Sequence, residues 1–339
     1  MPAAPRAAMA LSKLSGDEHG ILFVQLCNVL DPGIAVALSS VSKELRTATR
    51  ALLPQLKTGH EAAAALCHKL GKSCEQLREA KEVICLHRGL TADELKLLGT
   101  LGSVLRALET LILHEPAAGP EGVQQLAAGL GAGALPAMTK LWIAGSHVGD
   151  AGASALAAAL GQGALPRLRS LALIDAASGD AGLVALAPAL RRLPALEGLY
   201  LDGSPFGDEG FAALVAPPPP AGAPPPTTGG LAKLKRLDLN GTEINDAGCA
   251  TLAAALDSGA LPALERLHLY DVPASAAAKA AVYEARANLK GGDAESEHEE
   301  LGSDRRRARR RRTRERTQRE TRTARGFDDS WPPLEKLHI

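Results

Sequence analysis

The sequence is short of aromatic residues, with two Trp, three Tyr and four Phe in 339 residues. A core made from it must rest on Leu, Ala and Val, and the 46% of hydrophobic residues supply enough of them for an extended core. No apolar run is long enough to cross a membrane, and the N-terminus lacks the apolar segment of a signal peptide. We therefore expect no membrane among its partners.

Cysteine is also scarce and irregularly placed. The five cysteines are Cys27, Cys67, Cys74, Cys85 and Cys249. An odd, scattered set does not make a disulfide framework, and it favours reduced thiols in an intracellular protein, either cytoplasmic or nuclear. Cys67, His68 and Cys74 approach the spacing of metal ligands, but no second pair follows, so we expect no metal.

The sequence lacks the residue patterns that indicate catalysis. Its nine histidines are scattered without a His-x-x-x-His pair, and there is no Gly-x-Ser-x-Gly nucleophile elbow. A recurring Gly-Asp-x-Gly phrase resembles part of a phosphate loop, but no Gly-Lys-Ser or Gly-Lys-Thr follows it. We expect a protein without enzymatic activity and without a cofactor.

The sequence does contain one phrase in five copies, a Leu-x-Leu pair followed by Gly-Asp-x-Gly or a variant of it. The four-residue signature starts eight residues after the first leucine of each copy, at Leu111, Leu141, Leu171, Leu199 and Leu237. These leucines are 30, 30, 28 and 38 residues apart, a sixth Leu-x-Leu pair begins at Leu267, and a fainter copy begins at Val83. A period of this length predicts a solenoid, an architecture that usually binds other macromolecules.

Each repeat combines a strand pattern with a helix pattern. The Leu-x-Leu pair is a short strand of period 2, and apolar residues at helical spacing, such as Leu156 and Leu160, follow it. An aspartate marks the expected helix start in four repeats, at Asp150, Asp180, Asp208 and Asp246. There a carboxylate accepts hydrogen bonds from free N–H groups of the first turn and favours the positive end of the helix dipole, so we interpret the four as structural helix caps. The faint first copy has Thr91 and Glu94 instead, the pattern of a capping box.

From about Glu82 to Leu289 the repeats resemble the leucine-rich repeats of the ribonuclease-inhibitor type, whose units carry a full helix. The resemblance implies an α/β solenoid in the form of a horseshoe, with about seven parallel strands on its concave face and helices on its convex face. We therefore expect a solenoid over 82–290, preceded by a small all-helical region over 1–81.

The strands of such a horseshoe turn alternate residues away from the core. With Leu111 and Leu113 inward, the register predicts a set of side chains on the concave face: His114, Lys140, Trp142, Tyr200, Asp202, Arg236, Asp238, Asn240, Arg266, His268 and Tyr270. Three of the five Trp and Tyr residues belong to this set, and Trp, Tyr and Arg most often anchor interfaces. We predict a protein partner here, although aromatic residues also suit half-buried strands without any partner.

Residues 1–81 have a different, helical texture. An Ile-Leu-Phe-x-x-Leu run, a break at 31–33 and a Val-Ser-Lys-x-Leu-Arg phrase ending at Arg46 resemble an F-box, although Ser15 stands where that family has proline and no Trp follows. The run consists of Ile21, Leu22, Phe23 and Leu26. The resemblance implies that these residues dock the adaptor subunit of a cullin–RING ubiquitin ligase, while the repeats hold the substrate. The alternative is a helical cap over the first repeat, because solenoid ends need a polar cover.

Three further segments interrupt or follow the repeats. The proline-rich stretch 217–230 is either a solvated spacer or a polyproline ligand. The charged segment 291–330, which holds twelve arginines between 305 and 325, is expected to be disordered and is a candidate for nuclear targeting or non-specific nucleic-acid binding. Residues 331–339 end on a near copy of 263–269, either a further repeat strand beside the previous one or the stray end of a truncated array.

These features indicate a non-enzymatic protein that binds a partner on the concave face of its repeats. Its most specific candidate role is substrate receptor of an F-box-type ubiquitin ligase. A plain interaction scaffold or inhibitor is the alternative. Ran GTPase-activating proteins share this type of repeat, so a GTPase-activating regulator is a third candidate, by fold analogy alone.

Overall fold

The computed structural model describes residues 28–41, 46, 53–145, 148–215, 230–286 and 288–291. All of them belong to the first of two units, Met1–Gly291. The adaptor-docking candidates Ile21, Leu22, Phe23 and Leu26 lie outside the described residues, as do 292–339 and nearly all of the proline-rich stretch. Predictions about these parts stay predictions.

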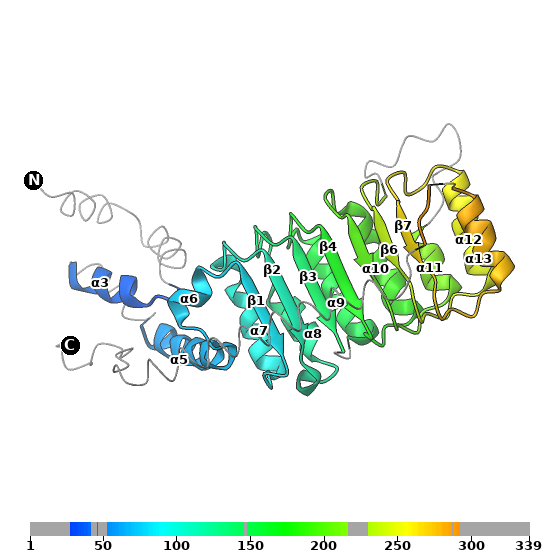
Figure 1. The fold of residues 1–339 in the computed structure, drawn as a ribbon. Helices are drawn as coiled ribbons and strands as arrows, with labels where there is room; N and C mark the ends of the chain where they lie inside the picture. Colours follow the sequence, from blue (N-terminus) through cyan, green and yellow to red (C-terminus); the bar gives the residue numbers. More distant parts are fainter. Residues whose placement is uncertain are drawn as a thin grey trace, which may run out of the picture. The chain divides into compact units, whose positions relative to one another are not determined.

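Seven parallel strands form one sheet in the order of the sequence (Figure 1). They are β1 (Glu82–Leu86), β2 (Thr110–His114), β3 (Lys140–Ala144), β4 (Ser170–Ile174), β5 (Gly198–Tyr200), β6 (Arg236–Asp238) and β7 (Arg266–His268). Each strand pairs with the next so that the first leucines of neighbouring repeats lie side by side, as Leu111 does with Leu141 and Leu141 with Leu171. This register places the first leucines in a row of buried side chains across the sheet.

A helix follows each strand, and these helices cover the same face of the sheet (Figure 1). They are α7 (Ala92–Thr100), α8 (Gly122–Gly129), α9 (Gly149–Gly161), α10 (Asp180–Arg192), α11 (Asp208–Leu214), α12 (Asp246–Asp257) and α13 (Ala276–Glu284). Leucines from both layers, such as Leu171 of β4 and Leu186 of α10, are buried in one core. The prediction of an α/β fold with a parallel sheet and one helix per repeat is confirmed.

Three helices precede the sheet: α3 (Gly33–Val41), α5 (Leu53–Leu70) and α6 (Cys74–Arg78). Helix α5 contacts β1 and buries Leu66 and Leu70, while α6 buries Leu77 in the same core. An ion pair joins α5 to α7, with Lys69 Nζ 2.8 Å from Glu94 Oε2. The predicted capping box of Thr91 and Glu94 starts α7. The end of α5 and α6 therefore cover the first repeat.

The last strand is covered by the segment that follows α13. Lys290 pairs with Arg266 in a parallel bridge, and Leu267 N donates to Lys290 O at 3.2 Å. The hydroxyl of Tyr283 donates to Leu267 O at 3.1 Å, which satisfies a carbonyl that another strand would otherwise take. This short segment protects an edge that would otherwise be open to pairing.

The aspartates at the helix starts also recur from repeat to repeat, and each forms hydrogen bonds to the next repeat. Asp150 Oδ1 accepts from Gly179 N at 2.8 Å and from Gly182 N at 3.0 Å, both at the start of α10. Asp180 Oδ1 accepts in the same way from Gly207 N and Gly210 N of α11, both at 2.8 Å. Each carboxylate thus satisfies two free N–H groups of the following helix.

The last two aspartates make one such bond each. Asp208 Oδ1 accepts from Asn245 N at 3.0 Å, and Asp246 Oδ1 accepts from Ser275 N at 2.5 Å. In these repeats the residue before the helix has its own capping side chain, because Asn245 accepts from the N–H of Ala247 and Ser275 from that of Ala278. Where the residue before the helix is glycine, it has no side chain that could cap the helix. The aspartate of the preceding repeat then accepts two hydrogen bonds from the start of that helix.

The structure differs here from the sequence-based expectation, which placed Asp150, Asp180, Asp208 and Asp246 as caps of their own helices. Each side chain reaches the neighbouring helix because parallel repeats bring successive helix starts side by side. The glycines of the signature are needed because the aspartate of the preceding repeat lies so close to the start of each helix. A Cβ on Gly182 would lie 2.6 Å from Asp150 Oδ1, and one on Gly210 would lie 2.7 Å from Asp180 Oδ1.

We expect Asp180→Ala to lower the free energy of unfolding by about 1–3 kcal/mol, because it leaves two N–H groups at the start of α11 without their acceptor. Asp180→Asn keeps an oxygen acceptor and should recover most of the loss. Urea denaturation of the three proteins, with hydrogen exchange at Gly207 and Gly210, measures both effects. Equal stability of the wild type and the alanine variant would show that the bond between repeats contributes nothing.

Candidate protein-binding surface

The sheet face opposite α7–α13 carries all eleven residues predicted for the concave face. The register sets most of them in rows. Lys140 and Arg236 start their strands, Trp142 lies in the middle of β3 and is level with Tyr200, Asp238 and His268, which end β5, β6 and β7, and Asp202, Asn240 and Tyr270 follow two residues after those ends. Among them we define the central row as Lys140, Trp142, Tyr200, Arg236, Asp238, His268 and Tyr270. Its members contact one another from β3 to the end of β7.

The central row begins with two aromatic rings, each next to a cation. Lys140 Nζ lies 3.6 Å from the centroid of the Trp142 ring, and the Trp142 and Tyr200 ring centroids are 5.5 Å apart. The Cζ atom of Arg236 lies 5.0 Å from the centroid of Tyr200. Cation–π contacts of this kind hold both the ring and the cation in place. The result is a rigid aromatic platform with a positive charge on each side.

Small residues between the large ones make room for this platform. Ala172 lies between Trp142 and Tyr200 in the register and is fully buried. Ser170 accepts a hydrogen bond from Trp142 Nε1 at 3.0 Å, which fixes the indole. A Cβ on Gly198 would lie 3.0 Å from Tyr200 Cε2, so this position is nearly closed to larger residues.

The later part of the central row is a chain of charged groups. Arg236 donates to Asp238 through Nε at 3.1 Å and through Nη2 at 2.9 Å, both to Oδ2. His268 Nδ1 lies 2.9 Å from Asp238 Oδ1, and the ring centroids of His268 and Tyr270 are 6.3 Å apart. The Asp238 and His268 side chains are only 5% and 2% exposed. This pair is too deeply covered to meet a substrate.

A second chain of hydrogen bonds follows the strand ends. Asp202 Oδ1 accepts from Asn240 Nδ2 at 2.8 Å and from Asn240 N at 3.2 Å. The side-chain oxygen Oδ1 of Asn240 in turn accepts from Tyr270 N at 2.9 Å. These bonds fix the backbone that carries Tyr270, whose side chain is 41% exposed and is the most accessible aromatic group of the face.

His114 stands apart from the central row. It ends β2, and its ring meets that of His87 edge-on with centroids 4.5 Å apart. A Cβ on Gly145 would collide with the His114 ring, so that glycine gives the ring its place. Around it the face is mainly apolar, with Ile112 and Trp142 at 8% and 7% exposure. The face changes from apolar over β1–β4 to polar over β5–β7.

Sequence reasoning missed Ser170 and Gly198 as parts of this surface, and it placed Ala172 on the apolar part of the face without showing that Ala172 makes room for the two rings. Their signal was present, because the repeat register places Ser170 and Gly198 level with Lys140, and Ala172 level with Trp142. Small residues do not indicate a binding surface in a sequence, because their role here is to leave space for larger side chains. Only the ring positions show that the space is used.

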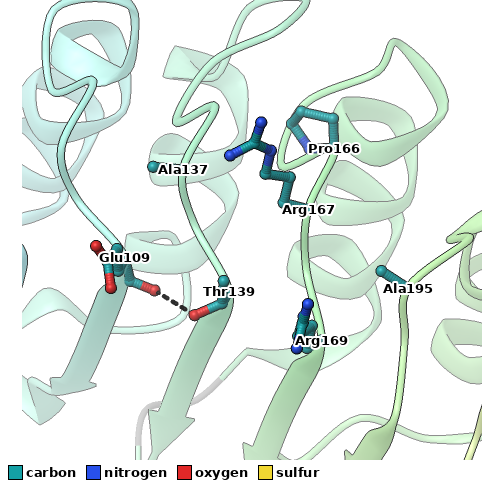
Figure 2. Close-up of a pocket in the computed structure, with 7 residues that line it drawn as sticks. All are labelled: Glu109, Ala137, Thr139, Pro166, Arg167, Arg169 and Ala195. Atoms are coloured by element: carbon teal, nitrogen blue, oxygen red, sulfur yellow. Dashed lines mark hydrogen bonds between the residues drawn. The ribbon is translucent and has the colours of Figure 1, made fainter.

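A shallow pocket of about 390 Å³ lies where the strands begin, away from the central row (Figure 2). Its lining comes from the segments that lead into β2–β5: Glu109, Ala137, Thr139, Pro166, Arg167, Arg169 and Ala195. The Thr139 hydroxyl donates to the Glu109 carbonyl at 3.1 Å, and Arg169 Nη1 lies 3.8 Å from Glu197 Oε1. None of the predicted partner-binding residues lines this pocket, so we do not assign it to the surface.

Within 28–291, apart from the stretches that the structure leaves out, no three His, Cys, Asp or Glu residues come together to hold a metal ion. In the same part of the chain, no helix is both long and apolar enough to cross a membrane.

Comparison with known families identifies the repeat. Residues 230–253 match a family model described as Leucine Rich repeat. No curated protein matches the chain. The matched stretch holds β6 and the first two thirds of α12, and the same strand, turn and helix recur along the sheet. The chain thus carries leucine-rich repeats, a kind of repeat that suggests a role in protein interactions.

One carboxylate of the surface provides a test of its electrostatics. Burial, followed by the negative charge of Asp238, raises the pKa of Asp202 from 3.8 to about 6, against the opposing hydrogen bonds from Asn240. A raised folded-state pKa means that Asp202 favours the folded state below pH 3.8 and that this contribution is lost as the pH rises through about 6.

We therefore expect Asp202→Asn to raise the free energy of unfolding at pH 7 by on the order of 1–2 kcal/mol. The gain should shrink as the pH falls through about 6 and vanish only well below pH 3.8, where Asp202 is neutral in both states. Urea denaturation of both proteins from pH 4 to pH 8 measures the difference. A difference that is constant over this range would mean that Asp202 does not carry the raised pKa.

Proposed function

We propose that the chain is a non-enzymatic protein-binding protein that recognises its partner on the exposed sheet face, with the central row as the anchor. The observation that carries the proposal is the platform of Trp142 and Tyr200, held between Lys140 and Arg236 before any partner arrives. Ordered aromatic and arginine side chains lose little freedom on binding, which is why they dominate interfaces. Repeat units of about 30 residues with a helix in each support the ribonuclease-inhibitor type.

The change in character along the face supports a partner with two kinds of contact. Over β1–β4 the face presents the apolar side chains of Ile112 and Trp142, and over β5–β7 it presents the more accessible Tyr200, Arg236 and Tyr270. A partner that fits would place apolar groups over the first part and hydrogen-bonding groups over the second. Catalysis forms no part of the proposal, since the acid and histidine of the row are covered by their neighbours.

The proposal predicts that contact with a partner is confined to this face. A photo-reactive amino acid in place of Tyr270, which is 41% exposed on the sheet face, should form a discrete covalent adduct in cell extract. The matched control carries it in place of Val184, which is 40% exposed on α10, and should form no such adduct. A further Lys140→Glu substitution should weaken the adduct at position 270 about tenfold, because it removes the cation over Trp142. Equal labelling at both positions would refute the assignment of the face.

A second proposal concerns the N-terminal region and has its support in the sequence of 14–46. We propose that the Ile-Leu-Phe-x-x-Leu run docks the adaptor of a cullin–RING ubiquitin ligase, which would make the repeats the substrate receptor. The burial of Leu66, Leu70 and Leu77 supports the competing role of a cap for α5 and α6, and one helical region can serve both purposes. A GTPase-activating role gains support from no particular residue, and we do not pursue it.

Adaptor capture by the full chain separates these two roles. We expect the double variant Ile21→Asp, Phe23→Asp to lose capture by at least about tenfold, because charges replace the apolar contact. Tyr270→Ala should capture the adaptor as the wild type does, since it alters only the sheet face. If the wild type itself captures no adaptor, the N-terminal region is a cap and the chain is a scaffold or inhibitor.

A further inference from the structure

Two cysteines meet where α5 turns into α6, outside the proposed binding surface. None of the four described cysteines, Cys67, Cys74, Cys85 and Cys249, forms a disulfide. Among them, Cys67 and Cys74 are hydrogen-bonded to each other through their side chains. Cys67 is buried in the core of the solenoid, and Cys74 packs against the same core while remaining partly exposed.

The turn between the two helices holds this contact in place. Gly71, with a φ of 71°, ends α5 in the left-handed conformation that closes many helices. Gly71 N donates to His68 O at 3.0 Å and Lys72 N to Cys67 O at 2.9 Å, the bond pair of a Schellman motif. The hydroxyl of Ser73 then caps α6, whose first residue is Cys74. Hydrogen bonds at the end of α5, in the turn and at the start of α6 thus hold the backbone between Cys67 and Cys74.

The environments of the thiols give them different reactivities. The hydrogen bond to Cys74, together with burial, raises the pKa of Cys67. Burial raises the pKa of Cys85 to about 12, with a smaller effect of Glu115, and burial also raises that of Cys249. Among the four described thiols Cys67, Cys85 and Cys249 are buried and Cys74 is partly exposed, so an oxidant reaches Cys74 first.

We propose that Cys67 and Cys74 form a reversible disulfide, a modification site that responds to low-molecular-weight disulfides such as glutathione disulfide. Cys74 gives its proton to water and attacks one glutathione sulfur, and the other glutathione leaves as a thiolate. Cys67 then gives up its proton and attacks the Cys74 sulfur, which breaks the mixed disulfide and releases the second glutathione. Two protein thiols are oxidised and one external disulfide is reduced to two thiols.

The bond would clamp the end of α5 to the start of α6 without touching the sheet. Both segments bury leucines against the first repeats, Leu66 and Leu70 from α5 and Leu77 from α6. A covalent link here removes local opening of the turn, because α6 has only five residues and depends on its cap and on Leu77. Oxidation should therefore slow amide exchange over 74–79 while leaving β3–β7 unchanged.

The test uses the full chain with Cys27→Ser, so that only described cysteines remain. The folded protein is equilibrated with glutathione disulfide and glutathione, quenched with acid, and digested without reduction. We expect a peptide linking Cys67 to Cys74, lighter by two hydrogen atoms than the sum of its parts, with Cys85 and Cys249 still free. A Cys67→Ser variant should instead keep glutathione on Cys74, because the second attack cannot occur.

Proximity in the sequence alone must be separated from the effect of the fold. The same equilibration in denaturing urea measures how readily an unfolded eight-residue loop closes. We expect the link to form with an equilibrium constant at least about tenfold higher in the folded protein, equivalent to about 30 mV in reduction potential. Equal constants, or a folded protein in which Cys74 stays free or ends as a stable glutathione adduct, would overturn the proposal.

Discussion

The hydrogen bonds from each aspartate to the start of the next helix keep the helical layer in step with the sheet. Strand pairing alone fixes the distance between neighbouring strands, but it leaves each helix free to slide along its own axis. Asp150 and Asp180 remove that freedom, since one carboxylate oxygen accepts from two N–H groups that lie only three residues apart. The glycines that face them follow from the same closeness, because a side chain there would meet the carboxylate.

A sheet held in this way presents its other face as a fixed pattern of side chains. The register brings Trp142, Ala172 and Tyr200 level, so the two rings meet across a small residue. The cations beside them come from the starts of β3 and β6, and Arg236 also binds Asp238. Order in the central row is therefore a consequence of order in the core. The same packing disfavours the charged form of Asp202, because burial and the nearby Asp238 raise the pKa of this carboxylate.

The ends of the array are built differently from its middle. At the N-terminal end the capping box of Thr91 replaces the aspartate bond, and α5 and α6 cover the exposed core with Leu66 and Leu77. At the other end Ser275 caps α13 with its own hydroxyl, and Lys290 and Tyr283 occupy the outer edge of β7. An end cannot rely on a following repeat, so local side chains take over its unpaired groups.

The sequence by itself determined the repeats, the α/β class and the parallel order of the strands, because each follows from a period that can be counted. It also located the aspartates at the helix starts. Only the tertiary structure decided which helix each aspartate serves, since a carboxylate and backbone N–H groups 27–37 residues later become neighbours through the stacking of repeats. The contact of Cys67 with Cys74 and the roles of Ala172 and Gly198 were likewise hidden. Contact and empty space are properties of packing, which a linear pattern does not contain.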